Sequence, residues 1–185
     1  MSERDEEGFG FAPEDDAPIP YMQRIRDYYQ ALGYGAPYRW AHYPEVPFAP
    51  LNKPLAQSRI GLVTTAAPYQ PGKGDQGPGA PYNGAAKFYA VYSGDSAADH
   101  DLRIAHIGYD RSHTSAADSN TWFPLPALRR LAEPENSGVR IGEVAPRFHG
   151  VPTDRSHRAT LERDCPELLA RVRDDRVDAV ILAAV

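Results

Sequence analysis

Four segments of the chain carry apolar runs long enough to be buried strands. These segments span residues 59–66, 102–109, 138–144 and 177–185. Their apolar positions are continuous rather than alternating, which is typical of a parallel sheet covered on both faces. Apolar spacing predicts short helices over 124–132 and about 157–173. The alternation of strand and helix from 102 to 185 predicts an α/β fold, with an open, mostly parallel, Rossmann-like sheet and helices on both faces.

The residues before 59 follow a different pattern. Apolar residues recur at helical spacing and are followed by Gly33, which predicts a surface helix over 20–32; they are Met22, Ile25, Tyr29 and Leu32. Five prolines between 34 and 58 exclude a regular helix there. We therefore expect an acidic disordered tail at 1–18, a helix and an irregular Pro- and aromatic-rich wrapping arm at 19–58, and an α/β domain at 59–185.

Charge and composition exclude several classes of function. Residues 1–18 carry a net charge of -6 and the rest of the chain carries +1, which together give the chain's net charge of -5. Without a basic excess, nucleic-acid binding is not expected. No run approaches the roughly 20 apolar residues of a membrane span, and no secretory signal is present. One cysteine, Cys165, excludes an intramolecular disulfide. These features predict a cytoplasmic protein.

Candidate ligand-binding residues follow the predicted strands. In open parallel sheets, ligands bind beyond the carboxyl ends of the strands. The residues expected at these ends are Thr64 and Thr65, then Tyr109, Arg111 and His113, then Arg147 and His149. Arginine offers a planar fork to a carboxylate. The sequence therefore predicts a crevice for a small carboxylate or amino-acid-like substrate, and the long Gly- and Pro-rich loop over 67–83 is a candidate lid.

Less specific interpretations remain open for several of these residues. Asp110 and Arg111 could form a simple turn with a surface ion pair. His106 lies inside a predicted strand, which favours a hydrogen-bonded core histidine. A metal site built from His106, His113 and His149 lacks a tight spacing motif. Cys165 on an apolar helical face is expected to be an inert core thiol.

Five stretches in order resemble one protein family. They are VPFAPLNKPLAQSRIGLVTTAA (46–67), DLRIAHIGYD (101–110), FPLPALRRL (123–131), IGEVAPRFHG (141–150) and VDAVILAAV (177–185). Together they are similar to the selenoprotein B family of glycine, sarcosine, betaine and D-proline reductases, over roughly 20–185. The resemblance implies an oxidoreductase subunit with α/β domains that works with other reductase subunits.

The resemblance also implies where the reactive residue lies. In the family, the strand equivalent to 177–185 runs directly into a selenocysteine or cysteine, followed by a further α/β half. We therefore expect that a UGA codon for selenocysteine follows Val185, that the chain is truncated and inactive as it stands, and that no other cofactor is needed. A truncated sheet would expose apolar surface, so a homo-oligomer is expected.

Two other functions fit the same residues. One is a non-catalytic small-molecule-binding or complex-assembly subunit on the same scaffold. The other is a metal-dependent hydrolase that uses the three histidines. A cysteine or selenocysteine just downstream in the gene would favour the reductase, whereas bound zinc or iron would favour the hydrolase.

Overall fold

The computed structural model describes residues 17–36, 39, 41–74, 77–135, 138–153 and 156–185. The chain divides into two compact units, Met1–His42 and Tyr43–Val185. The first unit contains α1 (Tyr21–Ala31), which confirms the predicted surface helix. Gly33 follows with a φ of 78°, as expected for a glycine that ends a helix. The acidic tail lies outside the described residues up to position 16.

The wrapping of the Pro-rich segment over the body stays a prediction. In the second unit, residues 43–57 are exposed, and their only regular element is a short 3₁₀ helix, η2 (Leu55–Gln57). Phe48 is 89% exposed and Val46 is 81% exposed. Burial begins at Ser58, directly before the first strand.

A mostly parallel sheet is built around β1 (Arg59–Thr64). On one side β1 pairs in parallel with β5 (Glu143–Val144) and then with β6 (Arg147–Gly150); on the other it pairs in parallel with β7 (Ala179–Ala183). An outer strand, β3 (Tyr92–Asp95), is antiparallel to β6. β1 is central because it has partners on both edges, and its apolar side chains are buried accordingly; Ile60, Leu62 and Val63 are each at most 3% exposed.

Pro146 separates β5 from β6. Proline has no N–H to donate to a ladder, so the pairing with β1 is interrupted at this point and then resumes. The predicted third strand over 138–144 therefore does not end the pairing, and the chain continues as β6. Arg147 and His149 lie inside this strand, so the expectation that they follow a strand end is wrong.

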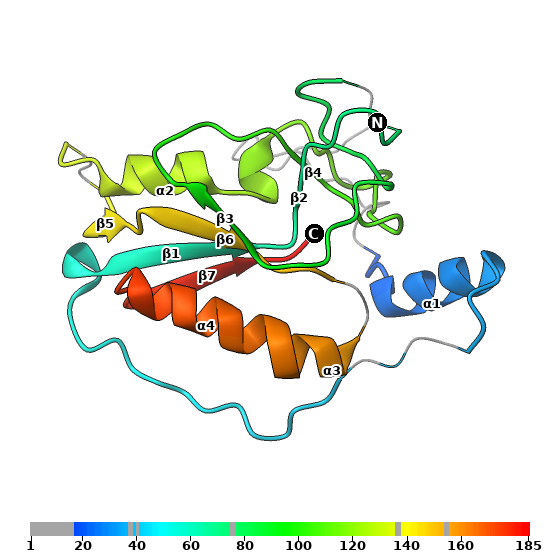
Figure 1. Ribbon diagram of the computed structural model, residues 1–185, viewed down its shortest axis with the longest axis horizontal. Helices are drawn as coiled ribbons and strands as arrows, with labels where there is room; N and C mark the ends of the chain where they lie inside the picture. Colours follow the sequence, from blue (N-terminus) through cyan, green and yellow to red (C-terminus); the bar gives the residue numbers. More distant parts are fainter. Residues whose placement is uncertain (1–16, 37–38, 40, 75–76, 136–137, 154–155) are drawn as a thin grey trace, which may run out of the picture. The chain divides into compact units, whose positions relative to one another are not determined.

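Helices lie on opposite sides of the sheet (Figure 1). α2 (Leu125–Ala132) is on one side, after a 3₁₀ turn, η3 (Ser119–Thr121). On the other side α3 (His157–Ala159), the π-helical turn η4 (Thr160–Asp164) and α4 (Cys165–Asp174) form one continuous helical segment. The predicted helix over 157–173 is thus confirmed. Pro166, which has no N–H to donate, lies just after the π-helical turn, where the regular α-helical hydrogen-bond ladder is already interrupted.

The predicted second strand over 102–109 is confirmed only at its first two residues, and its place in the parallel sheet is wrong. Only β4 (Leu102–Arg103) is a strand, and it pairs antiparallel with β2 (Ala67–Pro68) in a separate two-stranded sheet. The apolar run reflects burial of Leu102 and Ile104 in the core rather than membership of the parallel sheet. The β-α-β-α-β unit therefore begins with β1 and runs through α2, β5 and β6, α4 and β7.

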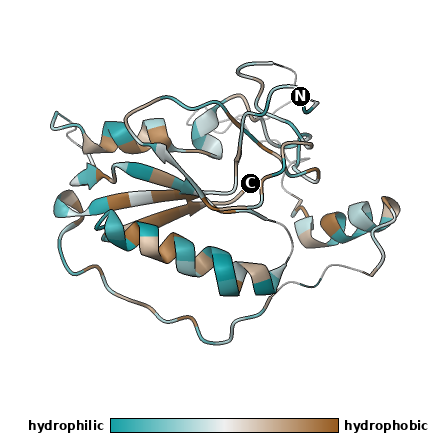
Figure 2. Ribbon diagram, viewed as in Figure 1, coloured by the Kyte–Doolittle hydropathy of each residue, from teal (hydrophilic) through white to brown (hydrophobic). Residues whose placement is uncertain are grey.

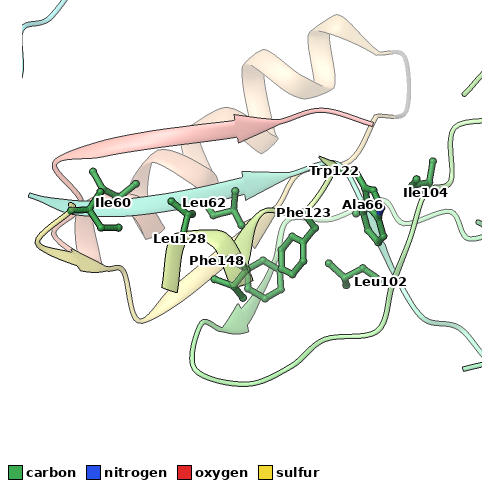
Figure 3. Close-up of a cluster of buried hydrophobic side chains, with 11 residues drawn as sticks. Ile60, Leu62, Ala66, Leu102, Ile104, Trp122, Phe123, Leu128 and Phe148 are labelled. Atoms are coloured by element: carbon green, nitrogen blue, oxygen red, sulfur yellow. The ribbon is translucent and has the colours of Figure 1, made fainter. Parts of the chain in front are cut away.

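One hydrophobic core lies between α2 and the sheet (Figure 3). It includes the buried side chains of Ile60, Leu62, Ala66, Leu102, Ile104, Trp122, Phe123, Leu125, Leu128, Ile141 and Phe148. The side chains of Ala66, Leu102, Ile104 and Trp122 extend this core past the end of β1 (Figure 3). The observed architecture is mixed α/β with a mostly parallel sheet; the closer likeness to a Rossmann fold stays a prediction.

The α4 side of the sheet is more polar. Hydrophobic colour is continuous along β7, whereas α4 alternates between hydrophilic and hydrophobic positions (Figure 2). No residue of α4 itself is buried, although Asp164 and Asp175, which flank it, are. Across the described part of the chain, no helix has the length and apolarity needed to cross a membrane.

Candidate strand-end crevice

The carboxyl ends of β1 and β7 are joined through the side chain of Thr65. The Thr65 N–H donates to the Ala183 carbonyl at 3.3 Å, continuing the ladder by one residue. Its hydroxyl donates to the main-chain oxygen of Val185 at 3.0 Å and accepts from the Val185 N–H at 2.8 Å. Because a hydroxyl can both donate and accept, Thr65 fixes Val185 directly beside the end of the central strand.

A narrow crevice of about 30 Å³ opens at this point. It is lined by Thr65, Ala86, Lys87, Phe88, Tyr89, Ala105, His106, Thr153 and Val185. The volume suits one small polar group, since ligand pockets for drug-sized molecules measure roughly 300–1,000 Å³. Its position matches the general rule that open parallel sheets bind ligands beyond their carboxyl ends.

The crevice lining includes one lysine, Lys87, and one histidine, His106. The Lys87 ammonium donates to the Ala105 carbonyl at 3.4 Å. The main chain at Lys87 is held in turn by the Gln70 side-chain amide, which donates to its carbonyl at 3.0 Å. The His106 ring packs against Gly108, so that a methyl group added at Gly108 would lie 3.2 Å from His106 Cε1.

Tyr92 anchors the segment that carries Lys87 and Phe88. Its hydroxyl donates to the Ala66 carbonyl at 2.7 Å, just past the end of β1. Burial raises the pKa of Tyr92 well above its usual range, so the hydroxyl stays protonated and able to donate. The Tyr92 ring also meets Phe88 edge to face with 5.3 Å between centroids. These contacts hold one wall of the crevice against the sheet.

A larger cavity of about 660 Å³ lies at the opposite, amino end of the parallel strands. Its lining includes the carboxylates Asp95, Glu133 and Glu143, which disfavour an anionic ligand. Among the described lining residues the one arginine, Arg129, already donates to the Ser96 carbonyl and to Asp99. Despite its size, this cavity is a poorer site for a small carboxylate than the strand-end crevice.

A sequence model of the glycine/sarcosine/betaine reductase selenoprotein B family matches residues 30–185. The chain belongs to this family. The resemblance seen in the sequence is thereby confirmed, and the family's name identifies its members as reductases. No curated protein and no solved structure gives a significant match.

In this selenoprotein B chain, only one of the residues predicted from strand ends lines the crevice. Thr65 does so. Thr64 is fully buried, and its hydroxyl accepts from the Ala66 N–H at 3.1 Å, which closes the turn after β1. Thr64 thus helps to end the strand.

The binding residues that were predicted to follow the strand over 102–109 do not line the crevice. They lie in and beside a turn. The Asp110 carboxylate accepts from the main-chain N–H groups of Ser112 and His113 and lies 2.8 Å from His113 Nδ1. The Arg111 guanidinium stacks over the Tyr82 ring at 3.9 Å, and Tyr109 packs against the core. The structure therefore places Asp110 in the turn that the less specific interpretation described, with His113 as its side-chain partner.

Arg147 and His149 point to the α4 side of the sheet, where they are already bound. Arg147 donates from Nε and Nη2 to the buried carboxylate of Asp175 at 2.9 and 2.7 Å. His149 Nδ1 is 2.8 Å from the Ser93 hydroxyl, which itself accepts from Arg171 at 2.7 Å. Burial lowers the pKa of His149, although Asp175 opposes this effect. We name Ser93, Arg147, His149, Arg171 and Asp175 the α4-side polar cluster.

The described residues do not support a metal site. Among them, no group of three or more histidine, cysteine, aspartate or glutamate side chains is arranged to hold a metal ion. His106 lines the crevice, His113 pairs with Asp110, and His149 belongs to the α4-side polar cluster. Cys165 is exposed, so its predicted place in the core is wrong.

Lys87, Tyr89 and Thr153 line the crevice but were not singled out in the sequence. Lys87 lies in a segment, 84–93, whose apolar pattern fits a helix as well as a strand. It follows no strand end, so the strand-end rule gave no signal for it. Contacts distant in sequence position it, among them the hydrogen bond from its ammonium to the Ala105 carbonyl.

Proposed function

We propose that this chain forms the substrate-facing part of a selenoprotein B-type reductase that cleaves a C–N bond in glycine, betaine, sarcosine or a proline-like substrate. One observation carries the proposal: a family match that spans residues 30–185. The crevice adds support, because a small space with a lysine and a histidine suits a small carboxylate better than it suits a nucleotide or a flavin.

The proposal includes a selenocysteine or cysteine directly after Val185 in the gene product. Its support is the family resemblance together with the place of Val185, which Thr65 holds in the wall of the crevice. A selenolate or thiolate there would be stabilised by neighbouring cations. It would attack the substrate α-carbon, forming a carbon–selenium or carbon–sulfur bond. The C–N bond breaks, and the amine leaves with the bonding electron pair.

This step leaves the substrate carbon attached to the nucleophile, so a reductant must release it. We propose that a thiol-containing partner subunit of the reductase supplies those electrons. The proposed partners are thus the small carboxylate substrate, the other reductase subunits and a second copy of this chain. No cofactor beyond the selenocysteine is included.

Reading the gene past the Val185 codon and assaying its complete product tests the proposal. With a UGA, UGU or UGC codon at that position, the product made with selenium should release ammonia from glycine, methylamine from sarcosine or trimethylamine from betaine in the presence of a dithiol. Replacing the nucleophile by serine should abolish release. An ordinary UAA or UAG stop would contradict the proposal. Ligand binding without amine release would favour the non-catalytic binding subunit.

A further inference from the structure

We propose that Lys87 and His106 form the subsite that binds the substrate's carboxylate. The inference rests on the proposed function for the identity of the substrate, but the site itself is drawn from the crevice. It replaces the arginines that the sequence indicated, because Arg111 stacks on Tyr82 and Arg147 is bound to Asp175.

The charge of the crevice favours an anion. Lys87 contributes a full positive charge, and none of the lining residues that the structure describes has an acidic side chain. An ammonium has three N–H donors, and the contact with the Ala105 carbonyl engages one of them. At 3.4 Å that contact is longer than the roughly 2.7–2.9 Å of a strong charge-assisted bond. The Lys87 ammonium can therefore turn toward a ligand at little cost.

His106 is the histidine of the crevice lining. Because Lys87 binds the carbonyl of Ala105, its ammonium lies beside the residue that precedes His106. A side chain at Gly108 would press on the imidazole, so the glycine leaves room for the ring. His106 and Lys87 both line the crevice, so a carboxylate bound there would meet both side chains.

The volume of the crevice limits which ligands can bind there. A volume of about 30 Å³ admits a carboxylate or a group of similar size. The α-carbon of a glycine-like ligand bound this way would remain near Val185, whose main chain closes the same crevice. We infer a short amino acid or N-methylated amino acid as the ligand.

Chemical modification of lysines tests the subsite without relying on catalysis. The chain has only three lysines, Lys53, Lys73 and Lys87. Limited acylation with an N-hydroxysuccinimide ester, followed by mass spectrometry, measures the rate at each one. Glycine or betaine at about ten times its dissociation constant should slow modification of Lys87 about tenfold. Lys53 and Lys73 serve as internal controls whose rates should not change. No protection of Lys87, or equal protection of all three, would overturn the proposal.

Substituted chains provide a second, independent test. Lys87→Met should weaken glycine binding by about tenfold or more, since bonds to charged groups contribute about 1.5–3 kcal/mol. Lys87→Arg should retain part of the affinity, and the matched control Lys73→Met should bind as the unmodified chain does. Gly108→Ala should also weaken binding, because the added methyl presses on His106. Circular dichroism checks that each variant is folded. Unchanged affinity in Lys87→Met would overturn the subsite.

Acetate distinguishes failure of the subsite from failure of the proposed function. If acetate protects Lys87 while glycine, sarcosine and betaine do not, the carboxylate subsite stands and the proposed substrate class is wrong. If a complete reductase with Lys87→Met keeps its substrate affinity and its amine release, the reductase stands and the subsite is wrong.

Discussion

A polar residue of this chain has a structural role when its side chain is buried and bound to a partner. Asp174 and Asp175 show the difference between an exposed and a buried carboxylate. Asp175 is 6% exposed and accepts two hydrogen bonds from Arg147, whereas its neighbour Asp174 is largely exposed and meets the same arginine. Removing one partner of a buried charged pair leaves the other unsatisfied. Exposed pairs contribute little.

Asp175→Asn should therefore lower the free energy of unfolding by about 1–3 kcal/mol. Asp174→Asn, a chemically identical change one residue away, should lower it by at most about 1 kcal/mol. Urea denaturation followed by circular dichroism measures both. Equal losses in the two variants would mean that the α4-side polar cluster does not stabilise the fold.

His149 makes stability depend on pH. Its pKa is lowered in the folded chain mainly by burial, so the unfolded chain binds a proton more readily as pH falls below the ordinary histidine value of 6.5. The stability that neutral His149 contributes is present above that value and is lost as pH falls from it toward the lowered folded-state pKa. We expect His149→Asn to flatten the dependence of melting temperature on pH between about 7 and 5. An unchanged slope in this variant would contradict the assignment.

Among the secondary-structure elements, close packing between β3 and β6 positions Tyr92, which holds one wall of the crevice. Tyr92 lies opposite Gly150, and a methyl group added at Gly150 would be 1.8 Å from the Tyr92 ring. Only glycine leaves room for the ring at this position. The same ring carries the hydroxyl bound to Ala66 and the contact with Phe88.

Gly150→Ala should cost about 1–3 kcal/mol of stability, as overpacking usually does. In a Tyr92→Ala background the same change should cost much less, because the clash is gone; the coupling should be at least about 1 kcal/mol. Chemical denaturation of the unsubstituted chain, the two single variants and the double variant measures this coupling energy. Additive losses would show that the ring and the glycine do not constrain each other.

The sequence predicted those elements whose pattern arises from local burial. β1, β7, α1, α2 and the segment from α3 to α4 were all expected, because their apolar runs or helical spacing match one environment throughout. The strand expected over 102–109 failed because Leu102 and Ile104 reach the core from outside the parallel sheet. Arg147 was misplaced because the strand resumes after Pro146, and Lys87 was missed because a contact distant in sequence, with Ala105, positions it.

At the scale of the whole molecule, β7 has one open edge among the strands that the structure describes, since it pairs only with β1. Its apolar side chains are exposed; Leu182 is 65% exposed and Val180 is 44% exposed. An apolar, unprotected edge strand is a template for pairing with another chain. This surface supports the proposed self-association.

Light scattering over a range of concentrations should therefore show a mass that rises above that of the monomer. Leu182→Lys should reduce the rise, because a charge on an edge strand opposes pairing. Val139→Lys alters a similarly exposed apolar residue, 70% exposed, away from β7 and should leave the rise unchanged. A clean monomer for the unsubstituted chain at high concentration would contradict the prediction.

Amide chemical shifts report whether a ligand binds where β1 and β7 end. In a titration of ¹⁵N-labelled chain with glycine, we expect the largest changes at Thr65, Lys87 and His106. Changes concentrated instead at Ala97, Glu133 and Gly142, around the larger cavity at the other end of the strands, would contradict it.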